Sequence, residues 1–476
     1  MGLKKNIVYS SILTVSGYIF PFLTFPYVTR VLGVEHFGVC SFFDSIIAYF
    51  TLFSMMGMAT LGIREIAKCN GDKEKLNKTY SSLFFLNFVS TFISIAVLLL
   101  SLFFVDRFQE SPKMIYIGCL KIVSNFLLVE WFYRGIENFK FITFRSILIR
   151  TLYVVMVFVL VREPEDYVLY FLLTALMFTV NAVINMIYSR NFVQFSLHNL
   201  EVKHYIKPFV IFGAYQLLTS MYTSFNVAYL GFTSGNIEVG YYSASVKLFN
   251  ILLSFYTAFT GVLLPRMSAL ALEGDSAGFS KLLSRSFNIL LSIAIPIVII
   301  SEVFAPEIVN IMSGGAFGNS VTPMRIVMPL LLIIGVEQIL VYQVLIPLNQ
   351  DKQVFINSTI GATVGIIANI ILVPYLASIG SAIVWLLSEL TVFTSTMYFA
   401  RLTIRKINIK EVLLNRGLAA APITISLFLL RFLHPGIKSF ALACIIIVIY
   451  YGLFEIFIVE DSEIRNQLLS VINKRK

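Results

Sequence analysis

The side chains best suited to chemistry in this sequence are charged residues inside long apolar stretches. A charged side chain at the middle of a bilayer costs about 2.5–3.5 kcal/mol on insertion scales, so it normally faces water, a partner or a substrate. Three cations and four carboxylates occupy such positions: Lys121, Arg150, Lys247, Asp44, Glu130, Glu337 and Glu389. We expect them to line a hydrated passage or to pair with one another.

Each type of charge suggests a role. A guanidinium can bind phosphate through two hydrogen bonds and an ammonium acts as a point charge, so the cations are suited to an anionic substrate group. The cations that we assign to the candidate substrate cavity are Lys121, Arg150 and Lys247. Three carboxylates are candidates either for counter-charges or for binding a coupling proton or sodium ion: Glu130, Glu337 and Glu389.

A weak internal repeat relates two of the charges. Gly38 and Gly240 each open an apolar stretch, lie 202 residues apart, and are each followed by an arginine 26 residues later. Asp44 and Lys247 follow these glycines by six and seven residues, which places both about 10 Å below the outer surface. We expect this pair to line the outer half of a central cleft and to close with it, and a permanent ion pair is the alternative.

The composition excludes most soluble classes. Of the 476 residues, 58% are hydrophobic and only 13% are charged, whereas about 25% are charged in an average soluble protein. The four cysteines and four histidines have no metal-ligand spacing, so we expect neither a metal site nor a disulfide. The net charge of +10 is spread between apolar runs, which indicates membrane topology and not nucleic-acid binding.

The apolar runs predict an all-α polytopic membrane protein with about fourteen spans of roughly 20 residues each. We place them near 8–30, 38–62, 79–104, 114–134, 142–161, 167–189, 207–230, 241–264, 284–304, 323–347, 354–374, 378–400, 417–433 and 437–458. Cytoplasmic loops are enriched in Lys and Arg. With the N-terminus inside, 26 of the 36 cations lie in inner segments and 7 in outer ones, which predicts that both termini are cytoplasmic.

Short loops and missing motifs argue against an enzyme. No loop between predicted spans exceeds roughly twenty residues, which leaves no room for a soluble catalytic domain. The sequence contains no Gly-x-x-x-x-Gly-Lys-Ser/Thr loop for binding nucleotide phosphates. Energy for transport would therefore come from an ion gradient, a substrate gradient or a partner.

Several motifs together resemble bacterial polysaccharide-repeat flippases of the Wzx type. The stretches that carry the resemblance are Phe25–Gly33 with Phe37-Gly38, Trp131–Glu137, Gly314-Gly315 through Arg325, Pro347–Lys352, Asn369, Pro374 and Gly380–Ile383. Their order and spacing cover nearly the whole chain. The resemblance implies membership of the multidrug/oligosaccharidyl-lipid/polysaccharide exporter superfamily.

The resemblance further implies a fold and a function. The fold would consist of two six-helix lobes in a V, residues 1–200 and 201–405, and two C-terminal helices with a cytoplasmic tail in residues 406–476. The chain would flip polyprenyl-diphosphate-linked oligosaccharide repeat units, such as O-antigen units of lipopolysaccharide, across the bacterial inner membrane by alternating access. Its partners would be this glycan, membrane lipids and other polysaccharide assembly proteins, with proton or sodium coupling and no other cofactor. By resemblance Arg30 joins the candidate cavity residues.

Other functions remain open from the sequence. A multidrug/cation antiporter of the same superfamily commonly carries acidic residues in its first helix, and the run 8–30 holds none. A flippase for the peptidoglycan precursor lipid II would differ only in substrate. A membrane-embedded polymerase or glycosyltransferase would be an enzyme and would ordinarily need a large external loop. A scaffold would need structural reasons for seven charges inside spans.

Overall fold

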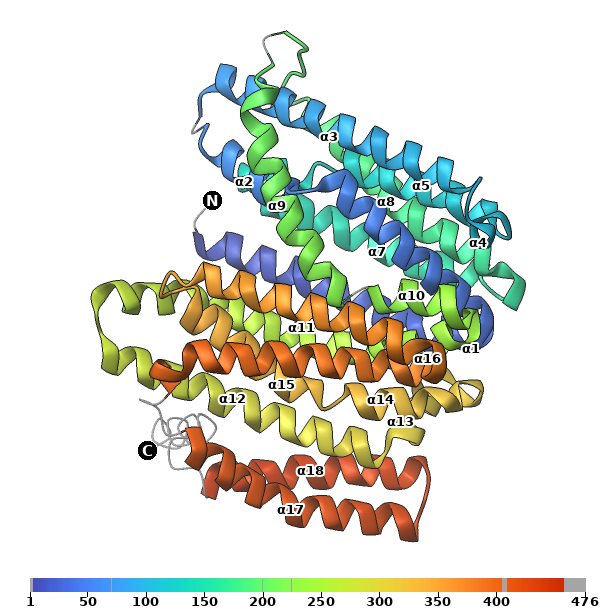
Figure 1. Cartoon of the computed structure of the whole chain (residues 1–476), viewed down its shortest axis with the longest axis vertical. Coiled ribbons are helices and arrows are strands. Elements are labelled where there is room, and N and C mark those ends of the chain that lie inside the picture. Colours follow the sequence, from blue (N-terminus) through green and yellow to red (C-terminus); the bar gives the residue numbers. More distant parts are fainter. Residues whose placement is uncertain (1–2, 70, 199, 224, 405–408, 458–476) are drawn as a thin grey trace. The chain divides into compact units, whose positions relative to one another are not determined.

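The protein is built of helices, as the computed structural model shows over residues 3–69, 71–198, 200–223, 225–404 and 409–457 (Figure 1). No strand occurs within these ranges, so the predicted all-helical fold is confirmed. Two units form, Met1–Ser243 with Gly365–Ser381, and Ala244–Val364 with Ala382–Lys476. The predicted C-terminal tail lies outside the described residues.

The first unit holds the helices that begin the chain and a short part of a later helix. Its elements in chain order are α1 (Leu3–Met55), α2 (Met58–Ala67), α3 (Lys73–Ser101), α4 (Asp106–Gln109), α5 (Pro112–Leu127), α6 (Glu130–Gly135), α7 (Phe139–Leu160), the 3-10 turn η1 (Pro164–Asp166), α8 (Tyr167–Ser189), α9 (Val202–Thr223) and α10 (Phe225–Ser234). The helix pairs α5 with α8, α1 with α7, and α1 with α3 pack against each other. Helix α1 also packs against α5, so the helices that carry Asp44, Lys121 and Arg150 belong to one bundle.

The second unit holds most of the remaining helices. Its elements are α11 (Asn236–Glu273), which begins in the first unit, α12 (Ser276–Val303), α13 (Ala305–Ser313), the 3-10 turn η2 (Gly315–Ser320), α14 (Val321–Val327), α15 (Leu330–Leu340), the π-helical turn η3 (Val341–Leu345), α16 (Asp351–Ile404), α17 (Ile409–Leu433) and α18 (Ile437–Phe457). Helix α12 packs against α15, α17 and α18. The last two helices also pack against each other.

Two backbone breaks fall between predicted spans, and a third falls inside one. Helix α1 is interrupted at Gly33, with φ of 70°, between the first two predicted spans. Helix α16 is interrupted at Ala377, with φ of 47°, between the predicted spans 354–374 and 378–400. A further break at Val129, with φ of 37°, separates α5 from α6 inside the predicted span 114–134. Each long helix thus supplies two spans because one residue leaves the helical region of φ/ψ space.

Length and hydropathy identify membrane-crossing stretches directly. Eight stretches in the described part of the chain qualify, among them Val8–Ala67 and Asp351–Arg401, which each contain two predicted spans. Shorter apolar helices, Ala420–Leu433 and Ile437–Leu453, fall where the last two spans are predicted. The chain is therefore a multi-pass membrane protein, and the total of fourteen spans stays a prediction.

The repeat predicted from the sequence reappears in backbone geometry. Gly33 and Gly235, which lie at the same 202-residue offset as Gly38 and Gly240, have φ values of 70° and 86°. L-residues rarely adopt such angles, so glycine is the residue of least strain there. Asp72 accepts a hydrogen bond from the backbone N–H of Lys75, and Asp275 accepts one from Gly278, at the starts of α3 and α12. Equivalent turns and caps at a nearly constant offset support an internal duplication.

The repeat-related glycines lie against each other within the first unit. A Cβ atom on Gly38 would collide with the carbonyl of Asn236 and the backbone nitrogen of Gly240. A Cβ atom on Gly240 would collide with the carbonyl of Val34. Helices α1 and α11 can approach this closely because neither glycine carries a side chain, as at other small-residue contacts between membrane helices.

We predict that Gly38→Val lowers the thermal stability of the purified protein in detergent. The added side chain meets backbone atoms that cannot rotate away, and overpacking of this kind costs typically about 1–3 kcal/mol. The matched control is Gly452→Ala on α18, where a Cβ atom meets nothing within 4 Å. A thermal unfolding scan checks both variants, and an unchanged midpoint for Gly38→Val would contradict the close contact.

Candidate functional site

An ion pair inside the first unit joins two of the predicted site residues. Nζ of Lys121 on α5 contacts Oδ1 of Asp44 on α1. The Lys121 side chain is 14% exposed, whereas that of Asp44 is 57% exposed. The ammonium also lies 5.3 Å from the ring centroid of Phe171 and 5.6 Å from that of Phe178, both on α8. The aromatic faces and the carboxylate together stabilise the cation at a depth where contact with lipid alone would be unfavourable.

Two tyrosines extend this cluster. Tyr153 on α7 and Tyr170 on α8 have neighbouring hydroxyl groups, which lie near the Asp44 carboxylate. We call Asp44, Lys121, Tyr153, Tyr170 and the rings of Phe171 and Phe178 the acid–lysine cluster. Four helices supply it, and it combines one exposed carboxylate, one cation, hydroxyl groups and aromatic faces. Such a set can bind a charged, hydroxylated ligand through ion pairs and hydrogen bonds.

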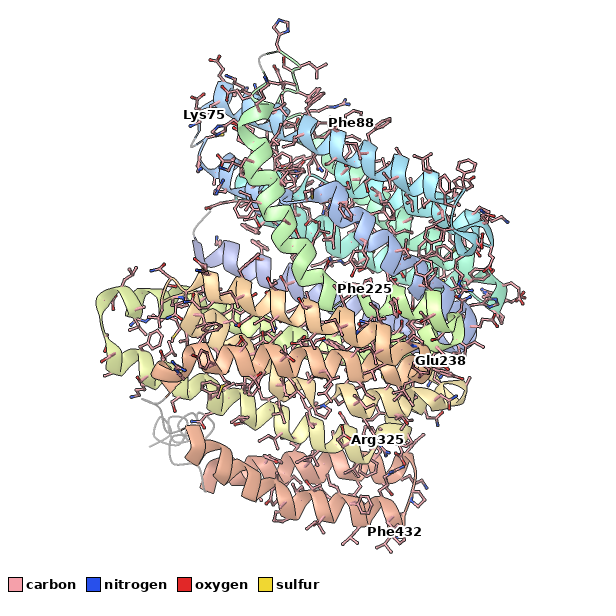
Figure 2. The ribbon with its side chains drawn as sticks, viewed as in Figure 1. Lys75, Phe88, Phe225, Glu238, Arg325 and Phe432 are labelled. Carbon is pink, nitrogen blue, oxygen red and sulfur yellow. The ribbon has the colours of Figure 1, made fainter. Side chains whose placement is uncertain are left out.

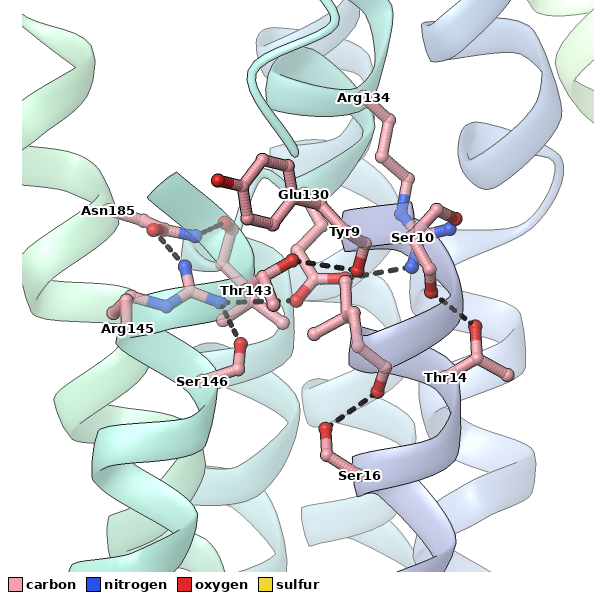
Figure 3. Close-up of polar contacts among 12 residues, drawn as sticks. Tyr9, Ser10, Thr14, Ser16, Glu130, Arg134, Thr143, Arg145, Ser146 and Asn185 are labelled. Carbon is pink, nitrogen blue, oxygen red and sulfur yellow. Dashed lines mark hydrogen bonds and ion pairs between the residues drawn. The ribbon is translucent and has the colours of Figure 1, made fainter. Parts of the chain in front are cut away.

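A second, largely buried network surrounds Glu130 (Figure 3). Nη2 of Arg145 on α7 lies 3.2 Å from Oε1 of Glu130, and Nη2 of Arg134 lies 3.4 Å from Oε2. Arg145 also donates from Nη1 to Oδ1 of Asn185 and from Nη2 to Oγ of Ser146, the latter at 2.9 Å. The Arg145 side chain is only 4% exposed. Glu130 is thus the counter-charge of two arginines in this structure.

The sequence around Glu130 explains its position. Val129 adopts a left-handed conformation, which ends α5 and lets α6 begin at Glu130. The next residues, Trp131, Phe132 and Tyr133, are at most 2% exposed and fill the aromatic core of the first unit. The Tyr133 hydroxyl donates to the backbone carbonyl of Asn185 at 2.6 Å. Burial of these rings, at about 1.5–3 kcal/mol for a large apolar side chain, fixes the short helix that presents the carboxylate.

The other predicted cavity cations occupy separate places. Nη1 of Arg150 on α7 donates to the carbonyl of Leu13 at 3.0 Å and to Oγ of Ser16, so its guanidinium is bonded to α1. Arg30 is exposed, and its Nη1 lies 3.4 Å from the carbonyl of Pro26. Lys247 is half-buried on α11 in the second unit. The structure brings Asp44 to Lys121, and a contact between Asp44 and Lys247 stays a prediction.

The two remaining carboxylates meet in the second unit. Glu337 on α15 and Glu389 on α16 have neighbouring carboxyl groups. Glu389 is 4% exposed, and its Oε1 accepts a hydrogen bond from Nε1 of Trp385 at 3.0 Å. Oε2 of Glu337 is buried and has no hydrogen-bond partner among the described residues. A proton on one of two adjacent carboxyl groups would let that group donate a hydrogen bond to the other.

Aromatic residues and a π-helical turn lie next to the carboxyl pair. The Trp385 ring packs edge-on against Phe249, with 4.8 Å between ring centroids. The π-helical turn Val341–Leu345 follows α15 directly, and Tyr342 on this turn lies near Glu337. Single π-turns inside helices are frequent at functional sites. Within the described ranges, no group of three His, Cys, Asp or Glu residues is placed to hold a metal ion.

Sequence reasoning missed one residue of these sites and one pairing. Arg145 was expected in an inner segment, and the structure buries it against Glu130. The pairing of Lys121 with Asp44 was also not predicted. The sequence does contain a signal for this pairing, because Asp44 and Lys121 each lie about seven residues from the outer end of their predicted spans. Both spans run inward from their outer ends, so the two side chains lie at nearly equal depth.

Comparisons with known proteins agree with this architecture. The family model described as "Polysaccharide biosynthesis protein" matches residues 3–271. A protein of Escherichia coli (strain K12) named "Putative O-antigen transporter" is 26% identical over 409 residues, which cover 84% of this chain and 97% of that protein. The solved structure of "Lipid II flippase MurJ, inward closed conformation" matches with a TM-score of 0.74 at 15% identity, over 94% of this chain and 97% of that one.

A second solved structure has the same fold. An inward-facing multidrug resistance MATE family transporter of the MOP superfamily matches with a TM-score of 0.63 at 14% identity, over 84% of this chain and 98% of that one. The chain is a multi-pass membrane protein whose fold resembles those of these two proteins. The family match extends over more than half of the sequence. The chain belongs to the polysaccharide biosynthesis protein family.

We predict that Arg145→Met destabilises the protein by about 1–3 kcal/mol, because it leaves the Glu130 carboxylate and the Asn185 amide without a buried donor. The matched control is Arg134→Met, whose side chain is 39% exposed, so its loss should cost about 1 kcal/mol or less. Thermal unfolding in detergent measures both. Adding Glu130→Gln to Arg145→Met should recover part of the loss. Equal destabilisation by the two single variants would contradict the assignment.

Proposed function

We propose that the protein is a flippase for polyprenyl-diphosphate-linked oligosaccharide repeat units in the bacterial inner membrane. Family membership and the relative named for O-antigen transport support this function. The fold shared with a lipid II flippase and a multidrug transporter supports movement of a substrate by alternating access. The chain would move its substrate without making or breaking covalent bonds.

The exposed carboxylate of the acid–lysine cluster is the observation that carries this proposal. Asp44 lies within a candidate membrane span, yet 57% of its side chain is exposed. Lipid contact would cost about 2.5–3.5 kcal/mol for such a charge, so this surface faces water. A hydrated surface inside the membrane can accept the polar sugars while the polyprenyl chain stays in lipid. Lys121 can then exchange its ion pair with Asp44 for one with a diphosphate oxygen.

The cluster also fits the other parts of the substrate. Hydroxyl groups of Tyr153 and Tyr170 can hydrogen-bond to sugar hydroxyl groups. The rings of Phe171 and Phe178 hold the Lys121 ammonium from two directions, which leaves its remaining side to an anion. Arg150, bonded to Leu13 and Ser16, would act as a support of α1 more than as a phosphate ligand. Arg30 and Lys247 remain candidates for the cavity.

Two rival functions share the fold. A multidrug antiporter and a lipid II flippase both match in structure, and these likenesses concern the fold alone. The family match and the relative named for O-antigen transport favour the glycan substrate over both. Lipid II also carries a diphosphate and sugars, so the assay must compare the two lipid-linked substrates.

We further propose that the Glu337–Glu389 pair carries the coupling ion and that this ion is a proton. Glu130 already neutralises two arginines, which leaves the carboxyl pair as the stronger candidate among the three carboxylates expected to bind a coupling ion. The Trp385 N–H is a donor and not an acceptor, so it competes with a sodium ion for the same carboxylate oxygen. One shared proton satisfies the two carboxyl groups in a dry site.

We predict that Lys121→Gln slows flipping by at least about tenfold, as expected for loss of one charge-assisted contact of 1.5–3 kcal/mol. The assay uses proteoliposomes with a fluorescent polyprenyl-diphosphate oligosaccharide, and an impermeant quencher reports the outer leaflet. Lys113→Gln, at the exposed start of α5, is the matched control and should leave the rate unchanged. Equal rates for wild type and Lys121→Gln, or transport of lipid II in preference to the glycan lipid, would overturn the proposal.

We predict that Glu389→Gln removes the response of flipping to a pH gradient. An amide cannot release a proton, so the pair loses its exchangeable proton while Trp385 keeps its acceptor. The wild type should accelerate when a proton gradient is imposed at constant sodium, and the variant should not. Acceleration of the wild type by a sodium gradient at constant pH would count against proton coupling. Glu130→Gln, which alters the arginine network, should retain the pH response.

A further inference from the structure

A polar cavity lies at the end of the first unit that the positive-inside rule assigns to the cytoplasm. Its volume is about 800 Å³, and α2, α3, the segment after α8 and the start of α9 enclose it. We call it the α3–α9 pocket. Lys75, which lines the pocket, lies near the start of α3 and is labelled in Figure 2. The charged groups of its lining are Glu65, Lys68, Lys75, Glu201, Lys203 and His204.

The lining of this pocket has more cations than carboxylates, and both carboxylates are already in ion pairs. Oε1 of Glu65 is bound by Nε of Arg64 at 2.9 Å and by Nζ of Lys68 at 3.0 Å. Glu201 forms an ion pair of 2.6 Å with Nζ of Lys78, and this ammonium holds the pKa of the Glu201 carboxyl below its usual range. Both carboxylates therefore have cation partners. Lys75 and Lys203 add positive charge that can attract an anion.

The walls of the pocket are held by hydrogen bonds. The segment after α8 is bonded along α3, because Asn77 accepts from the backbone N–H of Gln194 at 2.9 Å and Ser82 accepts from that of Glu201 at 2.9 Å. Tyr205 is 6% exposed, and its hydroxyl lies near Thr79. A ligand entering the pocket would meet lysines on a fixed frame, which lowers the entropy cost of binding.

An apolar stripe leads away from the pocket. Val202 lines the pocket, and Ile206 and Val210 follow it at four-residue spacing on one face of α9. Ile206 and Val210 are 45% and 47% exposed, and Leu197 in the neighbouring segment is 65% exposed. Exposed apolar residues beside a basic pocket at a membrane end suit a ligand with an anionic head and an apolar chain.

We propose that the α3–α9 pocket binds the phosphate group of an anionic membrane lipid, with the lipid chain along the Val202–Ile206–Val210 stripe. Lys75 and Lys203 bind the phosphate oxygens. The pocket lies at the opposite membrane end from the predicted depth of the acid–lysine cluster, so it is a second site. The proposal is independent of the flipping activity, because it concerns lipid retention.

Native mass spectrometry of the full-length protein in detergent tests this inference. Phosphatidylglycerol and the zwitterionic phosphatidylethanolamine are added in equal amounts, and retained lipid is measured at increasing concentration. The test variant is Lys75→Gln with Lys203→Gln, and the matched control is Lys113→Gln with Lys140→Gln, which removes two exposed lysines outside the pocket. All four lysines are exposed, so both variants should fold.

The wild type and the control should retain phosphatidylglycerol in preference to phosphatidylethanolamine. The test variant should bind phosphatidylglycerol about tenfold or more weakly, since each lysine near an anionic lipid contributes about 1 kcal/mol. Displacement of phosphatidylglycerol by polyprenyl diphosphate would support the site and identify a diphosphate lipid as the preferred source of phosphate. Equal retention by wild type and test variant would overturn the proposal. Displacement by millimolar inorganic phosphate alone would also overturn it, because the site would then bind a free anion.

Discussion

The free-energy cost of placing an unpaired charge in the bilayer governs the arrangement of charged residues in this protein. Every charged residue within a span must be paired, protonated or in contact with water. The first unit pairs the buried Arg145 with Glu130, and it pairs Lys121 with Asp44, whose side chain is 57% exposed. The same constraint thus produces two kinds of site, and the exposure of the carboxylate distinguishes them.

The difference matters for function because the two pairs have different freedom to exchange partners. Arg145 is enclosed and has three polar partners, so replacing one of them would leave a buried charge unsatisfied. Lys121 has one exposed carboxylate partner and two aromatic faces, so an incoming anion can replace Asp44 without exposing the ammonium to lipid. We therefore assign support to the Glu130 network and ligand exchange to the acid–lysine cluster.

Backbone geometry brings these side chains together. Glycines at a constant offset permit the left-handed turns before α11 and within α1, and the contact between Gly38 and Gly240 lets these helices approach to backbone distance. The break at Val129 turns the chain so that Glu130 points back toward α7. In the second unit, a π-helical turn directly follows α15, the helix that carries Glu337 of the carboxyl pair. Irregular backbone therefore accompanies the polar sites in both units.

The sequence by itself predicted the helical class, the position of most spans and an internal duplication. It also identified the charged side chains that cannot face lipid without a large free-energy cost. Hydropathy and glycine spacing are local properties of the chain, so they can be read without a structure. Only the tertiary structure decided which charges meet: Asp44 with Lys121, Arg145 with Glu130, and Glu337 with Glu389. Depth along a span limits the possible partners, but the rotation of each helix and the choice of its neighbours depend on packing across the whole bundle.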